Sequence, residues 1–96
     1  MRVTGRDKLI KFSRKHADAK STLEAWFGEV SHKDCVWLTS HDIKARYPSA
    51  DFLANNRVIF NIKGNHYRLA VQVRYQNGLV LVEWVGTHAE YSKKTF

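Results

Sequence analysis

The side chains best suited to chemistry lie between residues 63 and 91 of this 96-residue sequence. They are cations and candidate proton carriers, namely Lys63, His66, Arg68, His88, Glu90 and Tyr91. Arginine is always charged and binds phosphate through paired hydrogen bonds, and histidine exchanges protons near neutral pH. Such a set suffices for metal-free RNA cleavage, in which a base takes the 2′-OH proton, cations stabilise a phosphorane and an acid protonates the leaving 5′ oxygen. The residue types also leave a plainer interpretation open, with His66 as a turn residue and Tyr91 as a cap on the core.

Other chemistries lack the residues that they need. His88-Ala89-Glu90 resembles the His-x-Glu of zinc deaminases, but the chain has no Pro-Cys-x-x-Cys. The histidines do not show the His-Glu-x-x-His spacing, and no glycine-rich phosphate loop or Gly-x-Ser-x-Gly elbow occurs. The single cysteine, Cys35, is expected to be a buried structural thiol. We therefore predict no metal site and no cofactor.

Three consecutive antiparallel strands must position the candidate side chains. Short β-branched, alternating or apolar runs predict strands over 58–62, 67–75 and 79–87. Gly64-Asn65 and Asn77-Gly78 suit two-residue hairpin turns. Alternation puts one set of side chains on the core face, namely Val58, Phe60, Ile62, Tyr67, Leu69, Val71 and Val73. The opposite, open face then carries Asn61, Lys63, Arg68 and Arg74.

The third strand is harder to orient because apolar residues compete for both faces. Glu83 should avoid the core, which places Leu81 and Val85 beside it on the open face. Gly86 is a candidate bulge position, so we do not extend the alternation to His88.

Helices are predicted over 5–16, 17–30 and 40–47, after a short edge strand at 1–4. Leu23, Trp26, Phe27 and Val30 recur at helical spacing and form a stripe that should pack on the sheet. Ser40 is predicted as the N-cap of the third helix, Pro48 as its end, and Trp37 and Leu38 as core anchors. RNA contacts are predicted for His66 and Arg74. They are also predicted for a basic face of the first helix that is otherwise simply solvated: Lys11, Arg14 and Lys15.

Composition limits the class of protein. The length indicates one domain, 1–96, of the α+β class, with helices packed on a mainly antiparallel sheet. A net charge of +7 favours a polyanion or an acidic protein as partner, although it also serves solubility alone. We expect a cytoplasmic protein without membrane contact, because no apolar run approaches the roughly 20 residues of a span and no signal peptide is evident.

Two motifs resemble the HigB toxin family of the RelE/ParE superfamily. FNIKGNHYRLAVQVRY contains Gly-Asn-x-Tyr-Arg-Leu, and VGTHAEY contains Thr-His-x-Glu-Tyr. The opening MRV, the basic helix after it and DIKARYPSADFLANNRVIF are similar to that family too, so the resemblance covers nearly the whole chain.

The resemblance implies an mRNA interferase that cleaves translated messages at the ribosome. It also implies a HigA-type helix-turn-helix antitoxin as partner, through which alone the toxin meets operator DNA. By motif, the family's catalytic positions fall on Lys63, Arg68, His88 and Tyr91, while His66 occupies a variable position. Ser92 stands where the family usually has Asp. The roles of base and acid do not carry over, because superfamily members differ in them.

Two alternatives to a nuclease stay open. The same scaffold could bind nucleic acid without cleaving it, or could act on another target such as a topoisomerase, as in the ParE branch. The net charge fits all three, and His88 together with Tyr91 favours the nuclease, because binding alone requires no proton carriers.

Overall fold

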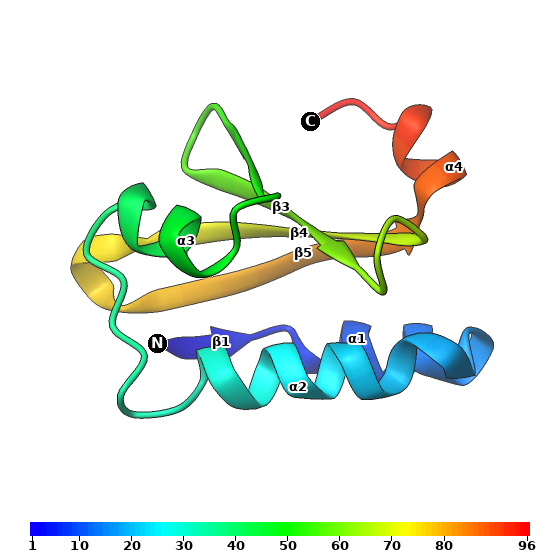
Figure 1. Ribbon diagram of the computed structural model, residues 1–96, viewed down its shortest axis with the longest axis horizontal. Helices are drawn as coiled ribbons and strands as arrows, with labels where there is room; N and C mark the ends of the chain where they lie inside the picture. Colours follow the sequence, from blue (N-terminus) through cyan, green and yellow to red (C-terminus); the bar gives the residue numbers. More distant parts are fainter.

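The computed structural model describes residues 1–96, and one twisted sheet forms its centre (Figure 1). Its strand order is β1-β5-β4-β3-β2, with β1 parallel to β5 and all other neighbours antiparallel. The strands are β1 (Arg2–Thr4), β2 (Asp51–Leu53), β3 (Arg57–Ile62), β4 (Tyr67–Arg74) and β5 (Leu79–Thr87). The predicted α+β class and the three central strands are confirmed. β2, a short edge strand, lies in a segment predicted as a connection.

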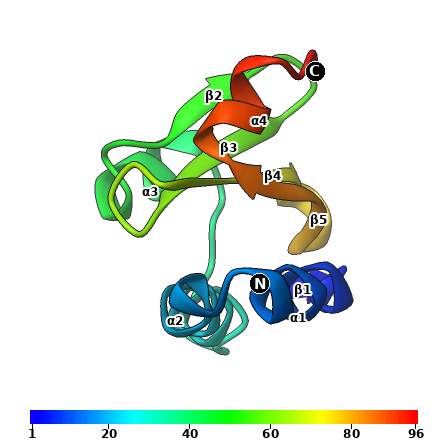
Figure 2. The same cartoon turned by 90° about the vertical axis from the view of Figure 1, so that its right-hand side faces the viewer.

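The helices divide between the two faces of the sheet. They are α1 (Arg6–Lys15), α2 (Lys20–Val30), α3 (Ser40–Arg46) and α4 (His88–Ser92), with short 3-10 turns η1 (Ala17–Ala19) and η2 (Tyr75–Asn77). Figure 2 shows α1 and α2 side by side under one face and α4 on the opposite side. None of these helices has the length and apolarity that a membrane crossing requires.

The core lies between the helices and the sheet. Leu23, Trp26 and Val30 of α2 are buried there, as the helical stripe predicts, and Phe27 is half-buried. From the sheet, the core-facing set predicted on β3 and β4 joins the same cluster. Burying these apolar side chains away from water is the main force that fixes the sheet against the helices.

Both hairpin loops are longer than predicted. Ile62 pairs with Tyr67, and Arg74 pairs with Leu79, so each loop has four residues. In the first loop, the two-residue turn was predicted at Gly64-Asn65, but the left-handed residues are Lys63, with φ 50°, and Gly64, with φ 63°. The strand pairing therefore stops before the predicted turn.

A bulge in β5 overturns the predicted orientation of its second half. Ala70 pairs with Trp84 while Val71 pairs with Val82, so the alternation shifts by one residue at Glu83. Val85 therefore packs toward the core and Trp84 lies on the open face. The bulge was expected at Gly86 but lies at Glu83.

Three smaller predictions in the loops and helix ends also fail. Leu38 is 70% exposed instead of buried, because its backbone N–H turns to the carboxylate of Asp42, 2.8 Å away. The N-cap of α3 is Thr39, one residue before Ser40, since Thr39 forms a capping box with Asp42. Helix 17–30 begins with the 3-10 turn η1 instead of regular helix.

Candidate active site

Arg68 is the one charged residue in the molecule that is buried. It projects from the open face of β4, as alternation predicts, but only 7% of it is exposed, so the expectation that it meets solvent there is wrong. Its guanidinium donates to the backbone oxygens of Asn65 and Tyr67, each at 3.2 Å, and to Asn65 Oδ1 at 2.7 Å. The loop before β4 thus folds back and holds the arginine.

All partners of the Arg68 guanidinium are neutral. None of the four ion pairs in the molecule includes Arg68. Three of its five N–H donors are used, which leaves the Nε–H and one Nη2–H free. A buried charge without a counter-charge is unfavourable, so the site is preorganised for an anion that would supply it.

Helix α4 brings Tyr91 to Arg68, while its other candidate residue, Glu90, caps the start of the helix. The helix begins at a capping box, in which the Glu90 backbone donates to Thr87 Oγ1 and the Thr87 backbone donates to Glu90 Oε1. These hydrogen bonds lower the pKa of Glu90 and keep it a carboxylate. The Tyr91 ring then lies with its centroid 5.9 Å from the Arg68 guanidinium carbon.

The two histidines meet at the same end of the sheet. The backbone N–H of His88 donates to the His66 carbonyl at 2.9 Å, which ties the start of α4 to the β3–β4 loop. Both side chains are exposed. The backbone thus brings the chain segments of His66 and His88 to the end of the sheet where Tyr91 faces Arg68.

Lys63 is not part of this group. It was expected on the open face, but its left-handed backbone turns the side chain toward the helices, where its Nζ lies 3.0 Å from Asp18 Oδ2. The same carboxylate group accepts from the Tyr67 hydroxyl at 2.5 Å, and this hydrogen bond, followed by that from Lys63, lowers the pKa of Asp18.

The other predicted RNA contacts are spread over the surface. Arg74 is at the far end of β4, six residues and about 20 Å from Arg68. Arg14 lines a groove between α1 and α2. Lys11 and Lys15 line a different groove, between α1 and β5, which has a volume of about 290 Å³ and leads toward the site.

Several residues at the site were missed by sequence reasoning. Asn65 holds Arg68, and Trp84 lies beside Tyr91 with ring centroids 6.3 Å apart. The Thr87 and Glu90 pair has a sequence signal, Thr-x-x-Glu, that predicts a helix start. For Trp84 no signal existed, because the bulge that turns it to the open face is not visible in the sequence.

No three His, Cys, Asp or Glu side chains lie close enough together to hold a metal ion. Burial raises the pKa of the Cys35 thiol, and the thiol lies far along the chain from the site. The chemistry available here is therefore that of one fixed guanidinium, two histidines and a phenol.

Comparison with known proteins places the chain in a family. The model of the HigB toxin family, described as the RelE-like toxic component of a toxin–antitoxin system, matches residues 19–94. No curated protein matches the chain. Since the family match covers most of the sequence, from the turn before α2 to the end of α4, this chain belongs to the HigB family of RelE-like toxins.

Proposed function

We propose that this toxin is an endoribonuclease that cleaves messenger RNA on the ribosome. The observation that carries the proposal is Arg68, a buried cation with neutral partners and two free N–H donors. A scissile phosphate suits these two donors because its oxygens accept paired hydrogen bonds from a guanidinium. Tyr91 faces Arg68, and His66 and His88 lie on the two chain segments joined beside it, so we assign proton transfer to these three residues.

The proposed reaction needs no group beyond these side chains and the RNA. One of His88 or Tyr91 removes the 2′-OH proton, and the 2′ oxygen forms a bond to phosphorus. Arg68 stabilises the extra negative charge on the phosphorane. The bond to the 5′ oxygen then breaks, a second side chain protonates that oxygen, and the upstream fragment ends in a 2′,3′-cyclic phosphate.

Partners follow from the family and the charge. Membership in a toxin–antitoxin family implies an antitoxin. We propose a HigA-type helix-turn-helix protein, which also links the toxin to operator DNA, and the messenger RNA and ribosome as targets in the cytoplasm. The net charge of +7 supports polyanionic targets and an antitoxin segment of acidic character.

The test uses a translated message with a single 2′-deoxy nucleotide at the cleavage position. We expect the ribosome-bound toxin to cut the all-ribose message and to leave the deoxy message intact while binding both equally. Equal cutting of both would rule out attack by the 2′ oxygen. No cutting of either, with growth arrest on expression, would favour a binding toxin or one with another target.

A further inference from the structure

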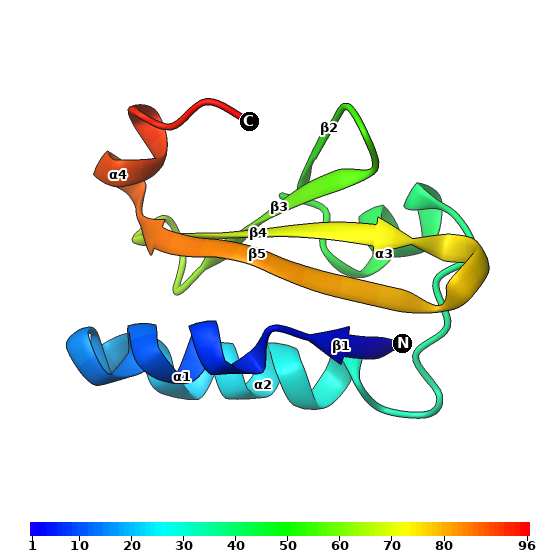
Figure 3. The same ribbon diagram turned by 180° about the vertical axis from the view of Figure 1, so that it is seen from behind.

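Three aromatic rings form a cluster on the open face, outside the main core. Trp84, Tyr91 and Phe96 have mutual centroid distances of 6.3, 6.1 and 6.0 Å. None of them belongs to the apolar cluster beneath the sheet. Figure 3 shows how the chain after α4 turns back over the sheet and brings its last residues there.

The position of Trp84 is built into the strand. An ideal Cβ at Gly86 would lie 2.2 Å from Cζ2 of the indole, so the ring rests directly against the Gly86 backbone. Gly86 is in turn the register partner of Arg68 on β4. The indole thus lies next to the position proposed for the scissile phosphate, with the glycine making room for it.

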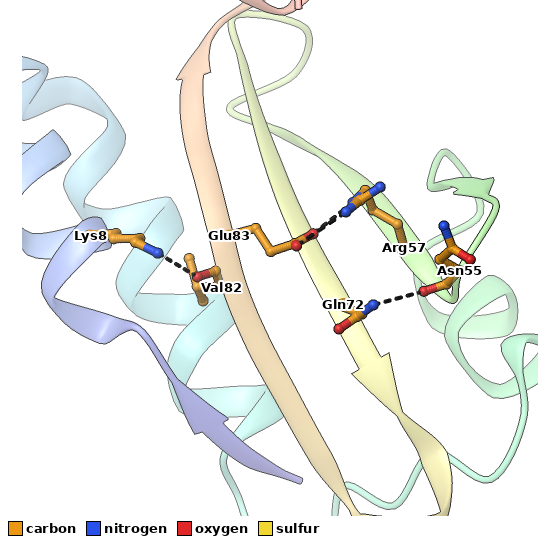
Figure 4. A network of polar contacts seen from close by, with 6 residues as sticks. All are labelled: Lys8, Asn55, Arg57, Gln72, Val82 and Glu83. Atoms are coloured by element: carbon orange, nitrogen blue, oxygen red, sulfur yellow. Dashed lines mark hydrogen bonds and ion pairs between the residues drawn. The ribbon is translucent and has the colours of Figure 1, made fainter. Parts of the chain in front are cut away.

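Cations frame the third ring of this cluster. The Arg57 guanidinium carbon lies 5.2 Å from the Phe96 centroid, and Lys94 Nζ lies 5.4 Å from both the Phe96 and the Trp84 rings. Glu83 holds Arg57 through hydrogen bonds of 2.7 and 3.2 Å, as Figure 4 shows. Phe96 itself is still 37% exposed. A flat ring between aromatic walls and cations occupies the kind of site that suits a nucleobase and its phosphate.

A basic groove continues from the indole along β5. Its walls include Trp84 and three lysines of α1, namely Lys8, Lys11 and Lys15. The single acidic residue in the groove, Glu83, is committed to Arg57. Lys8 also donates to the Val82 carbonyl at 3.3 Å, which anchors the start of α1 at the edge of β5 (Figure 4). Lysines beside an aromatic ring are typical of surfaces that bind single-stranded nucleic acid.

We propose that Trp84 is a stacking platform for a nucleobase of single-stranded RNA, and that the Phe96 ring, which meets the indole edge-on at an interplanar angle of 71°, covers the indole until RNA replaces it. The platform rests on the proposed function, because it serves the nucleotide next to the phosphate at Arg68. The α1 lysines then contact the phosphates of the adjoining nucleotides.

The test measures affinity for a short single-stranded 2′-O-methyl oligoribonucleotide, which cannot be cleaved, by fluorescence anisotropy at fixed salt. Trp84→Leu should weaken binding by about 10-fold or more, since stacking supplies much of the affinity for single strands. Phe96→Ala should tighten it by about 3-fold, because the competing ring is gone. Phe52→Ala is the matched control: this ring on β2 is 38% exposed and also lies near a lysine, and its loss should change nothing.

Two results would overturn the inference. Unchanged affinity in Trp84→Leu removes the platform, and unchanged or weaker binding in Phe96→Ala removes the idea that RNA takes the place of that ring. If Trp84→Leu does not fold, tryptophan fluorescence of the wild type replaces it. Trp26 and Trp37 are buried, so RNA should quench mainly the emission of Trp84. The Trp84→Phe variant, which lacks that emission, should show no such quenching, and a wild type without quenching would overturn the inference.

The outcome is separate from that of the nuclease. If message cleavage depends on Arg68 while Trp84→Leu binds RNA normally, only the stacking platform fails. If the oligonucleotide binds through Trp84 and no message is cut, only the nuclease fails.

Discussion

Arg68 is buried and has no counter-charge, so its replacement should affect the cleavage rate much more than the free energy of unfolding. Arg68→Met should lower the rate of message cleavage by about 10²–10³-fold, by analogy with the loss of other transition-state donors. Its free energy of unfolding should fall by no more than about 1–3 kcal/mol, because methionine removes a buried cation without a counter-charge but leaves the oxygens of Asn65 and Tyr67 without their donor. Single-turnover cleavage and urea unfolding measure the two effects.

The control is Arg74→Met, at the exposed far end of the same strand. This variant should cleave the message at the wild-type single-turnover rate. A variant at Arg68 that is strongly destabilised and still fully active would contradict the assignment.

At this scale the sequence predicted the face of Arg68 but not its burial. Strand alternation assigns a side chain to a face, whereas the loop that covers it is a tertiary feature. Lys63 shows the same limit, since a left-handed backbone and the distant Asp18 together turn it away from the open face. A motif could name Lys63 but could not say where its side chain points.

Helix α4 depends on its first turn, because it has only five residues. Thr87→Ala removes the capping hydroxyl and should destabilise the protein by about 0.5–2 kcal/mol. Cleavage should fall by at least 10-fold, since His88 and Tyr91 both stand on this helix. Cleavage rate and urea unfolding are measured on the same preparation.

The chain offers a matched control in α3, whose Thr39 forms a capping box with Asp42. Thr39→Ala should show a similar loss of unfolding free energy with cleavage intact. Equal cleavage in both variants would mean that α4 does not organise the site.

Elements were predictable where periodicity extended over many residues, as in the α2 stripe and the three central strands. The element borders were not, because they follow local geometry, and α4 was missed although Thr87 and Glu90 signal its start. A single bulged residue, Glu83, moved Trp84 and Val85 to opposite faces from those expected. Both hairpin loops are likewise longer than predicted, because the sequence does not show which of their residues adopt a left-handed backbone.

The whole molecule depends on the contact between α2 and the sheet. Trp26 is 3% exposed and meets Phe60 edge-on, with centroids 5.5 Å apart. Trp26→Ala should lower the free energy of unfolding by about 3–5 kcal/mol in urea. Trp26→Phe should lose far less, because it keeps a ring and removes an indole N–H that has no hydrogen-bond partner. A loss well below 1 kcal/mol in the alanine variant would show that this stripe is not core.

Acid should destabilise the fold through its paired carboxylates. Five have a lowered pKa in the folded state: Asp18, Glu29, Asp42, Glu83 and Glu90. In Glu83 the hydrogen bonds from Arg57 are the main cause. A lowered pKa stabilises the fold above the ordinary carboxyl pKa of about 4, and this contribution disappears as pH falls through the folded value.

The free energy of unfolding should therefore be nearly level above about pH 6 and should decline below about pH 5. Glu83→Gln should make that decline shallower in urea unfolding followed from pH 7 to pH 3. Glu24→Gln, at a position without an ion pair, should leave it unchanged. A decline of the same steepness in both variants would exclude the Arg57–Glu83 pair as a source.

The pairing of β1 with β5 has a consequence for how the protein folds during its synthesis. Arg2 pairs with Leu79, so the first strand to be synthesised waits for the last before it enters the sheet. Chains emerge N-terminus first, and contacts this distant in sequence form slowly. A nascent chain that stops before β5 should stay open to protease, lacking both the strand that carries Trp84 and the helix that follows it. The sheet of the toxin is thus complete only after β5 has been synthesised.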